Sequence, residues 1–326
     1  MHSNKQVGST DIARQGCHVA EMQRRRLLSA FVEVLAEQGL ENASVGRVCK
    51  RASVSRRTFY ELFDNRDECL LATFDQAIET LARPVVAAWG REKEILTKTG
   101  WLERVRRACA VLLERLDAEP DLARLCVVET LKAGPVVAQR RADVVGVLVA
   151  AVERGRDVTQ RGQESPPLAG QGVVGGALSV IHARLLETVP GASPRLTDLT
   201  GALMAMIVHP YLGSAAAGRE LERPAPEVSD RSNGALKDPF KDISIRFTYR
   251  TARVLETIAA HSGASNRYVA DTSGIADEGQ TSRLLARLQR AELIENQSAG
   301  REKGEANAWA LTERGKAVQT ALAGRG

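Results

Sequence analysis

Four side chains that can bind nucleic acid lie close together in the first fifth of this 326-residue sequence. They are Arg56, Arg57, Thr58 and Tyr60. A guanidinium group donates paired hydrogen bonds to guanine edges and to phosphates, and hydroxyl groups contact phosphates or bases. Phe59, Leu62 and Phe63 alternate with these residues at helical spacing, which leaves the polar side chains on the free faces of a short helix. The pattern predicts that this helix contacts DNA with its N-terminal end.

A second short helix is expected just before this one. Val45, Val48 and Cys49 share a helical face, and Ser44 stands at the N-cap position. Residues 52–55 are small and polar around one apolar side chain, which predicts a tight turn that ends in a second capping serine. The two helices and the turn predict a helix-turn-helix. We expect its DNA contacts, and one from the start of the next helix, at Ser44, Arg47, Ser55, Arg56, Arg57, Thr58, Tyr60 and Arg66.

The segment from Arg26 to Leu71 resembles the DNA-binding domain of TetR-family regulators. It contains, in order, an apolar helix that ends at Gly39, the turn, an aromatic helix and an acidic start to the following helix. Ser53 departs from the family, which usually has glycine there because the turn needs a left-handed backbone. Cys49 replaces the usual alanine. Neither change removes an expected DNA contact, so we expect some strain in the turn and no loss of function. A three-helix core with solvated arginines is the alternative interpretation.

Composition limits the other classes of protein. The length predicts about two domains, and the net charge of +5 is a modest bias toward polyanions. The five cysteines show no metal-ligand spacing and are interpreted as buried thiols in a reducing cytoplasm. No signal peptide or membrane span is indicated. A run of arginines, Arg24–Arg26, opens the first helix, where it could face phosphate or water.

The middle of the chain is expected to be entirely helical. Helical periodicity between proline and glycine breaks, among them Pro84, predicts helices over 66–83, 101–118, 121–133, 135–157, 170–188 and 195–214. The TetR resemblance implies that the last two of these helices pair with their twins across a homodimer axis. Both are apolar over much of their circumference and contain small residues, although burial inside a monomer would explain the same pattern.

The resemblance also implies a small-molecule effector that binds in the helical core. Candidate lining residues are Trp89, Trp101, Cys126, Thr130, His182, Met204 and Met206. Each of these residues, taken alone, is more often explained by packing. The histidines are too isolated in the sequence to suggest a metal site, and no cofactor is expected.

A separate module is expected at the C-terminus, after a proline-rich linker at residues 222–242. The sequence predicts a helix from Ile245, a helix over Asn266–Ser273, a turn at Gly274, a helix capped by Asp277 and a hairpin before a closing helix. This order resembles the winged-helix domains of MarR-like regulators. Its expected DNA contacts are Gln280, Thr281, Ser282, Arg283, Arg287, Arg301 and Lys303. Nearby glutamates would repel phosphate, so a protein-interaction role stays open.

The sequence therefore predicts a mainly α protein, a TetR-like all-helical regulator with an additional C-terminal winged helix-turn-helix. Its expected parts are a flexible arm (1–19), a DNA-binding domain (20–66), a ligand-binding and dimerisation core (67–221), the linker (222–242) and the winged-helix domain (243–324). The expected function is one-component transcriptional regulation, with repression as the expected output, in which an effector modulates the affinity for operator DNA. The alternative is an architectural protein that bridges DNA with two different heads. No catalytic triad, phosphate-binding loop or metal cluster suggests an enzyme.

Overall fold

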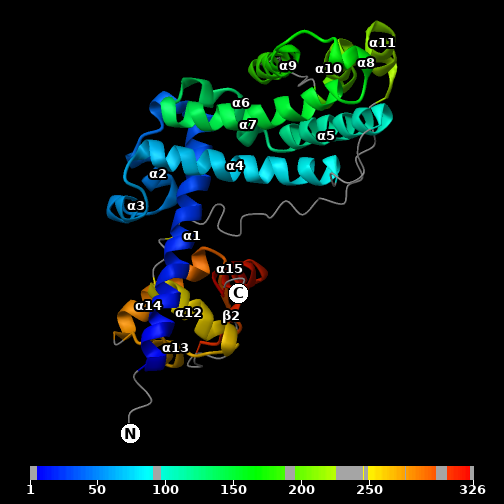
Figure 1. Cartoon of the computed structure of the whole chain (residues 1–326). Helices are drawn as coiled ribbons and strands as arrows, with labels where there is room; N and C mark the ends of the chain where they lie inside the picture. Colours follow the sequence, from blue (N-terminus) through cyan, green and yellow to red (C-terminus); the bar gives the residue numbers. More distant parts are fainter. Residues whose placement is uncertain are drawn as a thin grey trace. The chain divides into compact units, whose positions relative to one another are not determined.

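The computed structural model shows a mainly helical chain (Figure 1). It describes residues 6–90, 97–187, 195–224, 245, 249–275, 277–298 and 307–323. The chain divides into two compact units that do not follow chain order. One unit, here called the terminal unit because it contains both ends of the chain, comprises residues 1–30, 44–65 and 234–326. The other, the helical core, comprises residues 31–43 and 66–233. This division differs from the expected one, because the C-terminal segment and the N-terminal helix-turn-helix, which were expected to be separate domains, fall in the same unit.

The helical core contains most of the helices that the sequence predicts. After the short η1 (Leu40–Asn42) come α4 (Arg66–Trp89), α5 (Lys98–Ala118), α6 (Pro120–Val127), η3 (Glu129–Lys132), α7 (Pro135–Glu153), η4 (Arg154–Arg156), α8 (Gln160–Gln163), α9 (Ala169–Leu186), η5 (Leu196–Leu199), α10 (Thr200–Leu212) and α11 (Ser214–Glu222). Pro120 and Pro135 occupy first-turn positions, where the missing N–H has no helical partner to lose. Gly213, with φ of 80°, separates α10 from α11.

The predicted helix end at Pro84 is wrong. Helix α4 continues through this proline to Trp89, although Pro84 lacks the N–H that would bond to the preceding turn. Packing compensates for the lost hydrogen bond: α4 lies along α5 (Figure 1), and Trp89 packs against the apolar cluster of the core. Tertiary contacts therefore outweigh the local helix-breaking tendency.

The apolar cluster of the core joins α5, α7, α9, α10 and α11. Its buried members are Trp101, Val105, Val152, Val173, Val174, Met204, Ile207, Val208, Tyr211 and Ala216. Trp101 and Tyr211 meet edge to face with ring centroids 5.5 Å apart. A Cβ atom on Gly155 of η4 would lie within 2.9 Å of both rings, so only glycine fits at this position.

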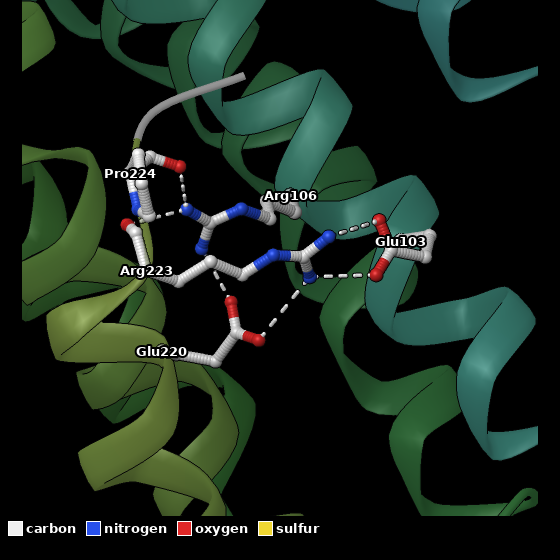
Figure 2. A network of polar contacts seen from close by, with 5 residues as sticks. All are labelled: Glu103, Arg106, Glu220, Arg223 and Pro224. Atoms are coloured by element: carbon white, nitrogen blue, oxygen red, sulfur yellow. Dashed lines mark hydrogen bonds and ion pairs between the residues drawn. The ribbon is translucent and has the colours of Figure 1, made fainter.

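A buried ion pair fastens the last core helix to α5 (Figure 2). Arg106 Nη1 donates to Glu220 Oε2 over 2.5 Å. Arg106 Nη2 donates to the carbonyl oxygens of Arg223 and Pro224, at 2.8 and 2.6 Å. The guanidinium of Arg223 in turn makes two hydrogen bonds to Glu103, which lower the pKa of that carboxyl below its usual value. The chain is thus held on α5 up to Pro224, and residues 225–242 of the expected linker lie outside the described residues.

In the terminal unit, helix α1 (Gln6–Gln38) begins within residues 1–19, the segment expected to be a flexible arm. From Gln6 onward this segment is helical, which corrects the expectation. The unit boundary falls inside the helix, between Ala30 and Phe31. Residues 6–38 contain no proline, the residue that most strongly interrupts a helix, although Gly8 and Gly16 weaken it locally. Met22 is buried among apolar side chains of the C-terminal segment, and this burial stabilises the helical extension.

The other elements of the terminal unit form two successive groups. Helices α2 (Val45–Ala52) and α3 (Arg56–Leu62) follow α1. The second group, here called the C-terminal module, consists of residues 245–323 and contains α12 (Tyr249–Ala260), α13 (Asn266–Ser273), α14 (Glu278–Arg290), β1 (Ile294–Asn296), β2 (Trp309–Leu311) and α15 (Glu313–Ala323).

The C-terminal module carries the expected hairpin. Strands β1 and β2 are antiparallel, with Ile294 opposite Leu311 and Asn296 opposite Trp309. Ala264 forms an isolated bridge to Trp309, which brings the segment between α12 and α13 to the hairpin. Trp309 is buried, and its indole Nε1 donates to Asn266 Oδ1 over 2.6 Å, so the start of α13 is tied to the base of the hairpin.

Candidate nucleic-acid interface

The turn between α2 and α3 has the geometry that the sequence predicts. Ser53 takes a left-handed conformation with φ of 52° and ψ of 39°, where a side chain is sterically unfavourable. The Val54 N–H donates to the carbonyl of Cys49 over 3.0 Å and closes the turn. Ser55 then caps α3, because its Oγ accepts from the Thr58 N–H at 3.0 Å. The expected strain at Ser53 is confirmed.

The buried face of this helix-turn-helix is apolar and aromatic. Val48, Cys49, Val54, Phe59 and Phe63 are all buried. The Phe59 and Phe63 rings lie 5.5 Å apart at a tilt, which fixes the angle of α3 from inside. Burial raises the pKa of the Cys49 thiol, although the nearby Arg56 charge opposes the shift, so this cysteine is a packing group.

The opposite face presents arginine and tyrosine to solvent. The Arg57 side chain is 90% exposed and shares an ion pair with Glu61 one turn later, with Nε 2.9 Å from Oε1. Tyr60 is 58% exposed. Arg56 lies back over α2, because a Cβ atom on Gly46 would be 2.7 Å from its Nη2. Arg47 on α2 is also exposed. These four side chains could reach phosphates and bases.

The remaining expected contacts have structural roles as well. The hydroxyls of Ser55 and Thr58 lie 2.8 Å apart and form the cap of α3. Ser44 stands at the N-cap of α2 but makes no capping hydrogen bond with its side chain, so the predicted position is right and the predicted bond is absent. Arg66 begins α4 and pairs with Asp67 at 3.2 Å.

Two basic residues of α2 are further candidates that the sequence interpretation missed. Lys50 and Arg51 are exposed in the last turn of the helix. Their spacing from Arg47, three and four residues, places them on neighbouring positions of one helix side, which is the signal that could have found them.

In the arginine run of α1, Arg26 is buried, and its Nη1 donates to the carbonyl of Ile245 over 2.8 Å. It is therefore not available to phosphate.

The turn between α13 and α14 repeats the geometry of the first turn. Gly274 has φ of 67° and ψ of 33°, at the position equivalent to Ser53. The Ile275 N–H donates to the Ala270 carbonyl over 3.0 Å, as Val54 does to Cys49. Asp277 caps α14 and accepts from the N–H groups of Gln280 and Gly279, and these hydrogen bonds lower the pKa of its carboxyl.

Helix α14 exposes most of the side chains that the sequence predicts. Gln280, Ser282, Arg283 and Arg287 are exposed, and so is Arg290 in the last turn. Thr281 is the exception and corrects the prediction, since it is buried and its Oγ1 donates to the Asp277 carbonyl. Thr281 lies on the buried side because Leu285 and Leu288 follow it at helical spacing. The predicted contacts Arg301 and Lys303 lie outside the described residues.

The expected effector-binding residues fall into separate places. Trp89, Trp101 and Met204 belong to the apolar cluster of the core, and the Met206 sulfur lies near Gly176 of α9. Cys126 and Thr130 are buried in α6 and η3, where the Thr130 hydroxyl donates to the Cys126 carbonyl. Burial raises the pKa of Cys126 to about 12. His182 is half-buried on α9. Trp89, Trp101 and Met204 are thus brought together in one cluster, and Cys126 and Thr130 meet one turn apart.

The described residues contain neither a metal-ligand cluster nor a membrane-spanning helix. No group of three or more His, Cys, Asp or Glu side chains that could hold a metal ion occurs within the described ranges. None of the helices described here is long and apolar enough to cross a membrane.

Comparison with known proteins identifies the N-terminal segment. Residues 27–73 match the family described as bacterial regulatory proteins, tetR family. This match covers α2, α3, the adjoining part of α1 and the start of α4. The chain therefore carries a TetR-family N-terminal domain, the helix-turn-helix domain of bacterial DNA-binding regulators. No curated protein matches the chain.

Solved structures show a more distant similarity. A TetR family transcription regulator from Marinobacter aquaeolei VT8 is 21% identical, over 58% of this chain and 95% of that one, with a TM-score of 0.43. The fatty acid degradation regulator FadR from Bacillus halodurans is 20% identical, over 56% and 97%, with a TM-score of 0.46. FadR from Bacillus subtilis, solved in complex with stearoyl-CoA, is 18% identical, over 56% and 97%, with a TM-score of 0.46.

Proposed function

We propose that this chain is a one-component transcriptional regulator that binds operator DNA through α2 and α3. The observation that carries the proposal is the two-sided character of α3. Phe59 is completely buried, while Arg57 and Tyr60 project into solvent next to a capped N-terminus. An arginine that contacts guanine contributes about 1–3 kcal/mol of discrimination between bases. The TetR-family match over the same residues supports this assignment.

Homodimer formation is part of the proposal. A single short recognition helix buries little surface, whereas two heads can read half-sites about 34–36 Å apart or at multiples of that spacing. Of the two helices expected to form the interface, α9 is the better candidate, because Val180 and Leu186 are exposed on it. Helix α10 is packed against α5, α8, α9 and α11 of its own chain. We therefore assign α9 the main pairing role.

We further propose that a small apolar effector binds in the helical core near Trp101 and Met204. Tyr211 belongs to this cluster, and its pKa is raised to about 12 by burial and by the neighbouring Glu153 carboxylate. Coupling between an effector and DNA is typically about 1–3 kcal/mol, or roughly 5- to 150-fold in affinity. The effector must prefer one conformation of the protein, since equal affinity for both conformations would leave their equilibrium, and therefore the DNA affinity, unchanged.

The C-terminal module is proposed to be a MarR-like winged helix and a second DNA-binding head. Its order of helices, the α13–α14 turn and the hairpin joined to Ala264 support this assignment. The arginines on the outer side of α14 supply the expected positive charge. An architectural protein that bridges separate DNA segments would use the same two heads, so the arrangement of DNA in the complex decides between the two functions.

The central test is DNA affinity after removal of the exposed α3 side chains. Genomic DNA selected by the full-length protein supplies the operator, and fluorescence anisotropy measures binding at fixed salt. Arg57→Ala with Tyr60→Ala should weaken operator binding at least tenfold, because each lost contact costs about 1–3 kcal/mol. The matched control is Arg107→Ala with Leu131→Ala, which removes an exposed arginine and an exposed apolar side chain from the helical core. Unchanged affinity in the α3 variant, with helicity retained, would disprove the proposed interface.

A further inference from the structure

Helix α1 contributes to the hydrophobic core of the C-terminal module. Met22 is only 3% exposed and belongs to the same buried cluster as Val254, Leu255 and Leu288. Val19, one helical turn earlier, packs partly against this cluster. Arg26, one turn later, donates from Nη1 to the carbonyl of Ile245 over 2.8 Å. Because 19, 22 and 26 recur at intervals of three and four residues, they form one continuous face of α1.

The opposite side of α1 contacts the N-terminal helix-turn-helix. The Arg24 guanidinium lies over the ring of Phe63 at 5.5 Å from its centroid, and Phe63 is the C-cap residue that follows α3. Residues two apart on a helix point about 200° away from each other, so Arg24 faces away from Met22 and Arg26. Helix α1 is therefore shared: one side completes the C-terminal module, and the other side supports α3.

The outer side of α14 carries a row of arginines. Gln280, Arg283, Arg287 and Arg290 follow one another at three- and four-residue spacing, opposite the buried Leu285 and Leu288. The Arg283 and Arg290 Nε groups donate to carbonyl oxygens four residues earlier, which aligns both side chains along the helix. Within the described ranges, no carboxylate forms an ion pair with any of these three arginines. The Asp277 carboxylate is close enough to Arg283 for the guanidinium charge to help lower the pKa of that carboxyl.

We propose that the helix-turn-helix and the C-terminal module, mounted on the shared α1, bind one continuous stretch of double-stranded DNA, with α3 at the half-site and the α14 arginines on flanking phosphates. This inference rests on the proposed function and selects the regulator over the bridging protein. Two heads on one helix have a high effective concentration for neighbouring sites on the same duplex. The module therefore extends each half-site, and its docking on α1 is the structural condition for doing so.

The docking can be tested without removing any part of the protein. A protease recognition site is inserted between Asn233 and Gly234, at the boundary between the two units, and the folded protein is cleaved there. The two fragments should co-elute in size-exclusion chromatography, because the Met22 face holds the C-terminal fragment. Met22→Leu keeps the apolar volume and should preserve co-elution, whereas Met22→Glu buries a charge and should release the fragment. Separation of the wild-type fragments would overturn the proposal.

The shared DNA site can be tested by hydroxyl-radical footprinting of the full-length protein. Arg283→Ala with Arg287→Ala should shorten the protected region at its outer edges and reduce affinity about tenfold. The slope of log K against log salt should become shallower by about two, since each released phosphate contact contributes about 0.9. Arg107→Ala with Arg219→Ala makes the same change in charge on exposed residues of the helical core and should leave the footprint unchanged. The uncleaved Met22→Glu variant should reproduce the shortened footprint.

Three outcomes are distinguishable. An identical footprint and salt slope for the α14 variant and the wild type would overturn the shared-site inference and leave the proposed α3 interface standing. Two duplexes bound per protein dimer, measured by analytical ultracentrifugation, would also overturn it and favour the bridging function. Absence of any operator binding by the wild type would instead refute the proposed function itself.

Discussion

At the scale of single residues, the turn of the first helix-turn-helix contains an unfavourable backbone that its counterpart avoids. Ser53 and Gly274 hold equivalent left-handed positions, with φ of 52° and 67°. A left-handed conformation costs a residue with a side chain about 1–2 kcal/mol, and glycine adopts it freely. The serine therefore reduces stability without touching the exposed face of α3.

Ser53→Gly should stabilise the protein by about 0.5–1 kcal/mol. The relief of strain exceeds the entropy that a glycine adds to the unfolded chain. Urea denaturation followed by circular dichroism measures the difference. The reverse change, Gly274→Ser, should destabilise by a similar amount, because a Cβ there meets no atom within 4 Å and only the backbone is affected. A decrease in stability for Ser53→Gly would contradict the strain argument.

Gly46 is a second residue whose missing side chain matters, because the Arg56 guanidinium occupies the space beside it. Gly46→Ala should displace Arg56 and weaken operator binding by about fivefold or more, since a bidentate arginine contact is worth about 1–3 kcal/mol. Anisotropy titration gives the change. Gly146→Ala on α7 is the control: its Cβ meets nothing, so operator affinity should stay the same. Equal affinities for all three proteins would show that Arg56 does not contact DNA in this position.

At the scale of elements, α11 is held to α5 by the Arg106–Glu220 ion pair. Both side chains are almost fully buried, and the guanidinium is also satisfied by two carbonyl oxygens beyond the helix. Removing one partner of a buried pair leaves an uncompensated charge, which is strongly destabilising. The pair therefore holds α11 and the two residues after it against α5.

Arg106→Met should destabilise the protein by about 3 kcal/mol, because the buried Glu220 would keep only the half-exposed Arg223, with Nη1 3.5 Å from Oε1, as a charged partner. The double variant Arg106→Met with Glu220→Leu should recover more than half of this loss, since both charges are then replaced by apolar groups of similar size. Denaturant midpoints of the two variants provide the comparison. Additive losses in the double variant would mean that the pair is not coupled as its 2.5 Å hydrogen bond indicates.

At the scale of the whole molecule, the C-terminal segment shares a core with the first helix of the chain. The sequence predicts that a fragment ending at residue 222 folds and dimerises, since the linker separates it from the module. The structure changes what this fragment should do. The cut removes the cover of Val19 and Met22, together with the carbonyl oxygens of Arg223 and Pro224 that accept from Arg106.

We expect the fragment 1–222 to be less stable than a fragment 1–230, which keeps both carbonyl oxygens. Each hydrogen bond to a charged group contributes about 1.5–3 kcal/mol, so the melting temperature should differ by several degrees. Met22→Gln in the longer fragment should reduce self-association, because less apolar surface is left uncovered. Differential scanning calorimetry and light scattering test the two effects. Equal melting temperatures for 1–222 and 1–230 would show that the carbonyl contacts carry little energy.

The local features of this protein can be predicted from its amino-acid sequence. The turn at Ser53, the caps Ser55 and Asp277, the glycine at 274 and the hairpin strands depend on interactions within a few residues, so their signals can be read directly. Helix periodicity likewise located most of the core helices. The exposed arginine and tyrosine of α3 followed from the same local pattern.

Which distant segments share a core depends on the packing of the folded chain. Met22 joins a cluster more than two hundred residues away in the chain, and Arg106 meets Glu220 across 114 residues. The continuation of α4 past Pro84 and the packing of one side of α10 within its own chain likewise depend on neighbours that no local pattern specifies. A single sequence encodes the preference of each face for burial, but the partner of that face is selected by the packing of the whole chain.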